Sequence, residues 1–217
     1  NREKINKPVD WEEWHMYPQT VNAYYNPSNN EIVFPAAILQ FPFFNMNADD
    51  AVNYGAIGVV IGHEMTHGFD DQGRQYDKNG NLEDWWTKAD SEEFDKRTQP
   101  LIDEFNGFAV GEGEHVDGKL TLGENIADLG GVLISLQAYH NSLKEKGEPA
   151  PIDGFTADQR FFLGFAQIWR GNIRPKELLR LAKEDVHSPA EYRVNRPLPN
   201  VDAFYAAFDV KEGDSMY

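Results

Sequence analysis

The chain has 217 residues, of which 41% are hydrophobic and 26% are charged, as is typical of a globular protein with a substantial core. Its formal net charge is -16, and it contains no cysteine. The acidic balance argues against nucleic acid or an anionic membrane as a partner, because both require basic patches. The lack of cysteine excludes disulfides and thiolate metal sites, so only histidine, aspartate or glutamate side chains can hold a metal ion.

The elements predicted along the chain begin with a little β structure and continue with helices. Two short strands, 21–25 and 31–34, flank the turn cluster NPSNN, and Pro35 ends the second. A loop or hairpin is predicted at 110–123, and helices at 51–68, 90–105, 124–146, 158–170, 174–188 and 201–208. This order predicts an α+β fold that is mainly helical and has a small sheet. No segment is long and apolar enough to span a membrane.

The segment VVIGHEMTHGFDDQG places two histidines and a glutamate at the end of an apolar run. On a helix, His63 and His67 share one face four residues apart, which is the spacing of two ligands on one tetrahedral zinc ion. Glu64 then projects beside the metal, where it can take a proton from bound water. The alternative is a chance match on a solvated helix face, which the apolar residues upstream disfavour. We therefore predict a zinc site here.

A catalytic zinc ion needs a third protein ligand and an open position. In LGENIADLGG, Glu124 and Asp128 lie four residues apart at the start of a predicted helix. Glu124 is the candidate third ligand, and Asp128 the candidate acceptor of a ring N–H from a ligand histidine. Two acids in a first helical turn also complement the helix dipole. Beside HExxH, in a chain without cysteine, the metal site is the better explanation.

The motifs HEMTHGFDD and GENIADLGG resemble those of the neprilysin and endothelin-converting-enzyme family of zinc metallopeptidases. Further segments resemble family segments in the family's order, namely VNAYYNPSNNEIVFPAAILQFPFF, LEDWW, FFLGFAQIW and DVHSPAEYRVN. The resemblance therefore covers nearly the whole chain. It implies a zincin-type, thermolysin-like catalytic domain that holds one Zn²⁺ ion through His63, His67 and Glu124, with Glu64 as the general base.

The resemblance also implies roles for residues around the metal. Asp128, and with it Asp70, would be partners of the ligand histidines. His187 would stabilise the oxyanion and would be oriented by Asp185. Taken alone, His187 would be explained as a surface or capping histidine, so its catalytic role depends on the resemblance.

Substrate binding is implied in the same way. Asn22 and Ala23 would hold the peptide backbone on the edge strand of the small sheet, a form of β-augmentation. Arg193, which by itself suggests only a salt-bridge partner, would bind a substrate carbonyl and brace the site. An apolar pocket for the residue after the scissile bond would be lined by Ile38, Phe43, Val60 and Trp169.

The chain is shorter than the proteins that it resembles, which have two lobes. We therefore expect residues 1–217 to form the catalytic domain of a larger protein, whose mostly helical N-terminal lobe closes over the zinc and restricts substrates to oligopeptides. Animal members of the family are membrane-anchored and disulfide-bonded. The lack of cysteine suggests a bacterial relative, and we expect a periplasmic or secreted location in preference to a cytoplasmic one.

These observations predict a zinc endopeptidase that cleaves short peptides at internal bonds, on the amino side of hydrophobic residues. A non-catalytic peptide-binding module is one alternative, and the presence of Glu64 argues against it. A zinc aminopeptidase with the same ligand arrangement is another. It would require a site for the free amine ahead of HExxH, such as a glycine-rich segment with an acid, and the segment VNAYYN offers none.

Overall fold

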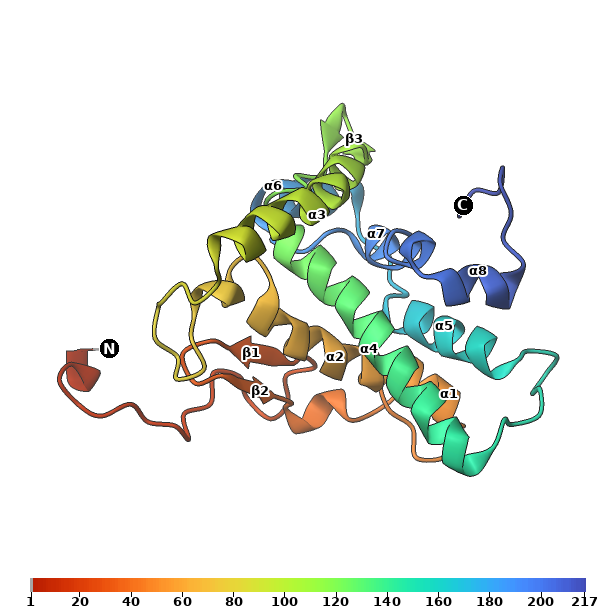
Figure 1. Ribbon diagram of the computed structural model, residues 1–217, viewed down its shortest axis with the longest axis horizontal. Helices are drawn as coiled ribbons and strands as arrows, with labels where there is room; N and C mark the ends of the chain where they lie inside the picture. The colour runs from red at the N-terminus through yellow and green to blue at the C-terminus, as the bar shows by residue number, and fades with distance from the viewer. Residues whose placement is uncertain (1) are drawn as a thin grey trace.

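A computed structural model describes residues 2–217 and consists mainly of helices, with two small antiparallel sheets (Figure 1). The strands are β1 (Tyr24–Asn26), β2 (Glu31–Val33), β3 (Ala109–Gly111) and β4 (Glu114–His115). The helices are α1 (Asp50–Asn53), α2 (Val59–Thr66), α3 (Lys88–Asn106), α4 (Leu122–Lys146), α5 (Ala157–Ile168), α6 (Pro175–Glu184), α7 (Ala190–Asn195) and α8 (Asp202–Phe208). The predicted mainly helical α+β fold with a small sheet is confirmed.

The β1–β2 hairpin starts later than the sequence predicted. Its register pairs Tyr24 with Val33 and Tyr25 with Ile32, and continuing this register would set Asn22 against Pro35, beyond the end of the ladder. Pro35 has no N–H to donate, and pairing ends before it. Asn22 and Ala23 therefore lie in the irregular segment that leads into β1, and their predicted place within the strand was wrong.

The helix predicted at 51–68 is a continuous helical run with changes of pitch. It passes from α1 through a π-helical turn, η3 (Tyr54–Gly58), into α2, and it ends in a 3₁₀ turn, η4 (His67–Phe69). Asp49 caps its start, where the carboxylate accepts the Ala51 N–H at 3.1 Å. A π-helical turn re-aims the residues that follow it and is common near functional sites. Here the residues that follow are those of HExxH.

Helices α2 and α4 lie side by side in the middle of the molecule because glycines allow their backbones to meet. A Cβ on Gly62 would lie 2.9 Å from Gly131 Cα, and a Cβ on Gly131 would lie 2.6 Å from the Val59 carbonyl oxygen. Any side chain at either position would separate the two helices. This contact brings HExxH on α2 beside Glu124 and Asp128 on α4.

The C-terminal third differs from the prediction at one place that matters for the site. The helix predicted at 174–188 ends at Glu184, and Asp185 leaves the helical conformation. Pro189 disfavours the helical conformation in the residue before it, and the Asp185 carboxylate accepts the His187 N–H at 2.9 Å. The segment 185–189 is therefore a loop, followed by the short helix α7, which the sequence did not predict.

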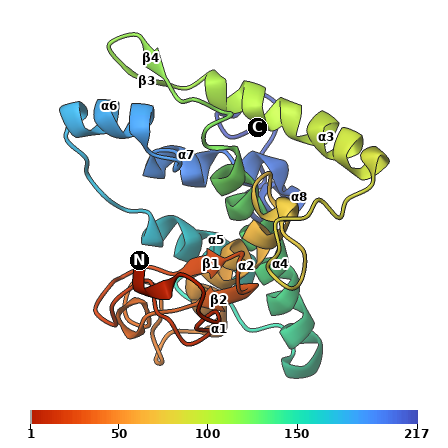
Figure 2. The same ribbon diagram turned by 90° about the vertical axis from the view of Figure 1, so that its left-hand side faces the viewer.

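Three hydrophobic clusters hold these elements together. The largest joins α4, α5 and α8, a second lies under the β1–β2 hairpin, and a third lies where α3 meets α6 and the β3–β4 hairpin. Figure 2 shows α6 and α7 above the β1–β2 hairpin, with α5 between them. Within residues 2–217, no helix is long and apolar enough to cross a lipid bilayer.

Candidate active site

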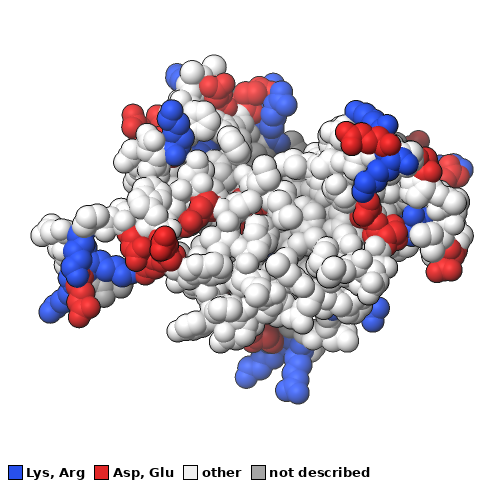
Figure 3. Space-filling model, turned by 90° about the horizontal axis from the view of Figure 1, so that it is seen from below, with Lys and Arg blue, Asp and Glu red and all other residues white. Residues whose placement is uncertain are grey.

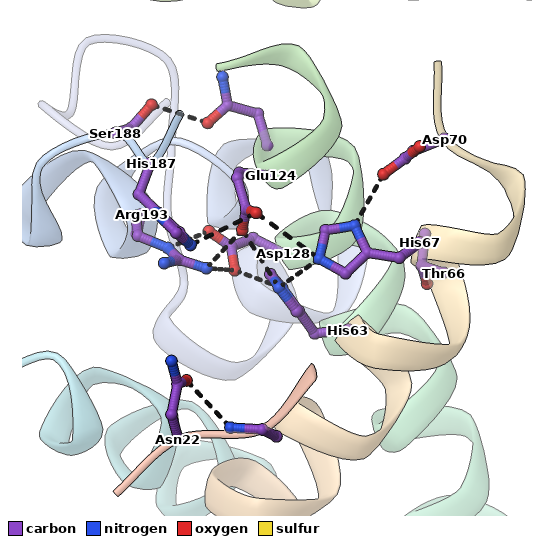
Figure 4. Close-up of polar contacts among 12 residues, drawn as sticks. Asn22, His63, Thr66, His67, Asp70, Glu124, Asp128, His187, Ser188 and Arg193 are labelled. Atoms are coloured by element: carbon purple, nitrogen blue, oxygen red, sulfur yellow. Dashed lines mark hydrogen bonds and ion pairs between the residues drawn. The ribbon is translucent and has the colours of Figure 1, made fainter. Parts of the chain in front are cut away.

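Two histidines and a glutamate meet where α2 and α4 cross. His63 Nε2 and His67 Nε2 lie 3.0 Å apart, and the Glu124 carboxylate oxygens lie 3.3 Å and 3.7 Å from them. One ligand atom from each of the three side chains lies within 4.8 Å of the other two. The predicted ligand set therefore gathers at one point in space (Figure 4).

The other ring nitrogens of both histidines face carboxylates. His63 Nδ1 lies 2.9 Å from Asp128 Oδ1, and His67 Nδ1 lies 2.7 Å from Asp70 Oδ2. An ionised carboxylate only accepts hydrogen bonds, so each Nδ1 carries a proton and donates it. The family resemblance implied that these two carboxylates are partners of the histidines, and in the structure each of them lies against one histidine ring.

This arrangement fits a zinc ion. Metal binding requires neutral imidazoles, and in that state each Nδ1 donates to a carboxylate while the free Nε2 atoms of His63 and His67 face each other and the carboxylate of Glu124. Two imidazole nitrogens and a carboxylate then converge on one point, an arrangement that a cation between them stabilises. Two imidazoles and one carboxylate are a usual ligand set of catalytic zinc, whose fourth position stays open.

Electrostatics keep the carboxylates of the cluster charged. Burial by itself would raise the pKa of Asp128, but the charge of Arg193 and the hydrogen bond from His63 hold it at about 2. Burial acts likewise on Glu124, and the hydrogen bond from His63 and the charge of His187 hold its pKa at about 2. Burial would lower the pKa of His63, but bonds to Asp128 and Glu124 raise it to about 9. The site therefore favours a positive charge between its carboxylates.

Glu64 lies on α2 next to the first histidine and lines the same cavity as the cluster. Only 5% of the surface of Glu64 is exposed to solvent. Burial raises the pKa of its carboxyl group, although the nearby His63 and His67 act to lower it. A carboxylate with a raised pKa is a stronger base than one in water, which suits general-base chemistry near neutral pH.

His187 reaches the cluster from the loop before α7. Its Nδ1 lies 2.6 Å from Asp185 Oδ1, and its Nε2 lies 3.3 Å from Glu124 Oε1. The ring lines the cavity, whereas Asp185 does not and contacts the site only through His187. The predicted pairing of these two residues is therefore present, with Nε2 on the side of the metal ligands.

Arg193 on α7 is buried behind the cluster. Its Nε and Nη2 donate to Asp128 at 2.7 Å and 2.8 Å, and Nη2 also lies 3.4 Å from Glu124 Oε2. The guanidinium lies over the Trp169 ring at 3.9 Å. Arg193 thus braces both carboxylates that α4 contributes, as expected, while its contact with a substrate carbonyl remains a prediction.

A cavity of about 760 Å³ opens beside the cluster and is lined by all four residues predicted for the apolar pocket, Ile38, Phe43, Val60 and Trp169. Asn22 and Ala23 also line it. The Asn22 Oδ1 accepts the Ala23 N–H at 3.0 Å, which leaves its amide nitrogen pointing toward the cluster (Figure 4).

Sequence reasoning did not single out several other residues of the cavity wall. They include Met16, Val21, Tyr24, Tyr25, Gln72, Tyr76, Phe165 and Ile168. Phe165 precedes Ile168 by three residues and Trp169 by four, so helical spacing places Phe165 on the same face as each of them, a signal that was available. Tyr24 and Tyr25 lie on the short strand β1, and the others lie outside the main helices and strands, where no periodicity indicates which side chains face a site. Figure 3, viewed from below, shows a face with few charged side chains in its middle, although the net charge is -16.

Comparison with known proteins supports the same conclusion. The sequence pattern of Peptidase family M13 matches residues 22–217. The chain is 45% identical over 218 residues to an endothelin-converting enzyme homolog of Locusta migratoria, covering 100% of this chain and 30% of that protein. It is 43% identical over 217 residues to human neprilysin, covering 98% of this chain and 29% of neprilysin.

Solved structures agree in fold. The zinc metalloprotease ZMP1 of Mycobacterium tuberculosis, in complex with an inhibitor, matches with a TM-score of 0.94 and 56% identity over 99% of this chain and 34% of that one. PepO from Lactobacillus rhamnosis matches with a TM-score of 0.86 and 40% identity over 96% of this chain and 31% of that one. The chain thus spans about a third of the length of these relatives. The resemblance inferred from HEMTHGFDD and GENIADLGG is confirmed, and the chain belongs to peptidase family M13.

Proposed function

We propose that this chain is the catalytic part of a zinc-dependent endopeptidase that hydrolyses internal bonds of short peptides. The observation that carries the proposal is the convergence of His63, His67 and Glu124 beside the buried base Glu64 on the wall of one large cavity. Membership in a family of peptidases points to the same chemistry. Because the chain spans about a third of the length of its relatives, the activity of the whole protein is part of the proposal.

His63, His67 and Glu124 would hold the zinc ion, which when bound acts as a Lewis acid toward the scissile carbonyl and lowers the pKa of bound water to about 7. Glu64 takes a proton from the attacking water and later delivers it to the leaving amine. His187 would donate Nδ1–H to Asp185, and its Nε2, on the side of Glu124, would donate to the oxyanion that develops on the carbonyl. A donor of this kind typically contributes about a hundred- to a thousandfold in rate.

Substrate would bind along the segment before β1. The Asn22 amide nitrogen faces the cluster, and the edge of β1 that does not pair with β2 is available for an extended peptide. The apolar wall beside the cluster would receive the side chain after the scissile bond. We therefore expect cleavage on the amino side of hydrophobic residues, a preference that sequencing of the products from a mixed peptide library measures directly. Products with no apolar preference after the cut would refute it.

The rest of the protein belongs to the proposal too. Residues 1–217 form the catalytic domain, an N-terminal helical lobe of the same protein limits access to short peptides, and the protein acts outside the cytoplasm of a bacterium. Cell fractionation with an antibody to this domain tests the location. The role of the lobe is tested by comparing cleavage of peptides of increasing length by the chain alone and by the full-length protein. Only the full-length protein should lose activity as the peptides become longer.

The experiment that tests the function is hydrolysis of an N-blocked, internally quenched peptide by the zinc-loaded chain, alone and within the full-length protein. Glu64→Gln and a chelated sample serve as controls. Cleavage by the native protein only, with cuts at internal bonds, supports the proposal. Cleavage of free but not N-blocked peptides would indicate an aminopeptidase. Zinc and peptide binding without any cleavage by the full-length protein would indicate a peptide-binding module.

A further inference from the structure

A buried chain of hydrogen bonds joins the loop that carries His187 to the start of α4. The Ser188 hydroxyl donates to Asn125 Oδ1 at 2.8 Å, and Asn125 Nδ2 donates to the Thr121 hydroxyl oxygen at 3.0 Å. The Thr121 hydroxyl donates to the Asp117 carbonyl oxygen, also at 3.0 Å. The Asn125 amide thus bridges the Ser188 and Thr121 hydroxyls, with its oxygen accepting from one and its nitrogen donating to the other.

The ends of this chain lie next to two residues of the proposed active site. Ser188 directly follows His187, and Asn125 directly follows Glu124. Ser188 and Asn125 are 3% and 1% exposed, whereas the His187 side chain is 46% exposed. A half-exposed imidazole on a loop is therefore fixed by a buried neighbour, and Figure 4 shows the Ser188 bond beside His187 and Glu124.

The contact between Asp185 and His187 cannot fix the loop relative to α4. Asp185 and His187 are two residues apart in one loop, so their contact orients the ring relative to the loop and leaves the loop free relative to the metal ligands. The Ser188–Asn125 bond crosses 63 residues of sequence and ends on α4. Breaking it would leave a buried amide oxygen without a donor, which makes a buried bond costly to lose.

We propose that Asn125 and Ser188 are positioning residues that set where His187 Nε2 lies relative to the metal ligand Glu124. This inference rests on the proposed function, in which His187 donates to the oxyanion. Catalysis is sensitive to alignment, and a misplacement of about 1 Å costs up to about a hundredfold in rate. We expect Ser188→Ala to lower kcat about tenfold and to leave KM within about twofold, because the peptide-binding wall is untouched.

Ser135→Ala is the matched control. Ser135 is buried like Ser188 but lies on α4. Its hydroxyl donates to the Tyr54 carbonyl oxygen at 2.6 Å, away from His187. Both variants lose one buried hydroxyl, so they should show similar melting temperatures and unchanged zinc content, while only Ser188→Ala loses kcat. Thr121→Val, which removes the far partner of Asn125, should lower kcat in the same direction. Equal kcat for Ser188→Ala and Ser135→Ala would overturn the proposal.

A double-mutant cycle separates positioning from general damage. If Ser188 acts through His187, then His187→Ala and His187→Ala with Ser188→Ala should have the same kcat within about twofold. A further tenfold loss in the double variant would show that Ser188 acts elsewhere and would overturn the inference.

A measurement without substrate keeps this test distinct from that of the proposed function. In the zinc-loaded chain labelled with ¹⁵N-histidine, the ring signals of His187 are identified by their loss in His187→Ala. Ser188→Ala should shift or broaden these signals, and Ser135→Ala should not. If no peptide is cleaved, the proposed function fails, and the His187 signals still decide the placement. Unchanged His187 signals in Ser188→Ala would overturn the positioning role in either case.

Discussion

At the scale of single residues, Glu64 is the side chain on which the proposed chemistry depends most. It is buried beside both histidines without being placed to ligate the same point, because it projects from α2 about 100° away from His63. Its environment raises the pKa of its carboxyl group. In the proposed function it would act on water near the metal while His63, His67 and Glu124 would hold the ion.

Replacing Glu64 by glutamine should separate catalysis from metal binding. Glu64→Gln keeps the shape of the side chain and removes the base, so kcat should fall by about a hundred- to ten-thousandfold. Zinc content, measured by atomic absorption, should stay at the native level because the ligands are intact. Activity close to the native level would exclude Glu64 as the base.

The two carboxylates that face the ligand histidines should differ in what their loss costs. Asp128 also neutralises buried Arg193 through two bonds, whereas Asp70 accepts backbone N–H groups from its own loop. Either Asp128→Asn or Asp70→Asn should weaken zinc binding about 10- to 100-fold. Only Asp128→Asn leaves a buried cation poorly paired, so it should lower the free energy of unfolding by about 3 kcal/mol more.

Zinc titration and urea denaturation of the two variants measure these effects. Equal losses of stability in both variants would contradict the claim that pairing with Arg193 makes Asp128 more important for folding stability than Asp70. The distinction follows from one contact across the fold, since the two aspartates look alike in sequence, each near a metal-binding motif.

At the scale of elements, the crossing of α2 and α4 is what assembles the site. The apolar run with N-cap residues before it predicted the helix at 51–68, and the spacing of apolar residues predicted the helix at 124–146. Neither pattern revealed the π-helical turn, the early end of α6 or α7. These features depend on contacts made at one point in space, such as the Asp185 cap and the packing of Arg193 on Trp169.

A methyl group at the crossing should damage both stability and the site. In an isolated helix, Gly131→Ala would be stabilising by up to about 1 kcal/mol. Here its Cβ would lie 2.6 Å from the Val59 carbonyl oxygen and 2.9 Å from the His63 nitrogen, so we expect a loss of about 1–3 kcal/mol and weaker zinc binding.

Gly171→Ala is the control for that variant, since a Cβ there would meet only the Trp169 carbonyl oxygen, at 4.0 Å. Thermal unfolding with and without zinc compares the two. If Gly131→Ala proved as stable as Gly171→Ala, the close approach of α2 and α4 would not be a requirement of the fold.

At the scale of the whole molecule, the metal should act as a link between parts that are distant in sequence. His63 and His67 belong to one helical run and Glu124 to another, so an ion bound to all three favours only the folded state. At a free zinc concentration a hundred times the Kd, this contributes about 2.7 kcal/mol.

Removing zinc should therefore lower the melting temperature by about 5–10 °C, given the usual sensitivity for a chain of this size. Differential scanning calorimetry of the native, chelated and zinc-restored chain measures the shift, which should be reversible. Glu124→Gln, which weakens the third ligand, should reduce it. A melting temperature independent of zinc would mean that the three side chains do not bind the ion together.

The sequence by itself determined which residues are the candidates for the chemistry. The i, i+4 spacing of His63 and His67, and of Glu124 and Asp128, is local, and helical geometry converts it directly into shared faces. The match of motif order along the chain identified the family. Only the tertiary structure decided that Asp128 meets His63, that Arg193 braces Asp128, and that Ser188 bonds Asn125. These contacts join segments more than 60 residues apart, and no local period encodes a contact at that separation.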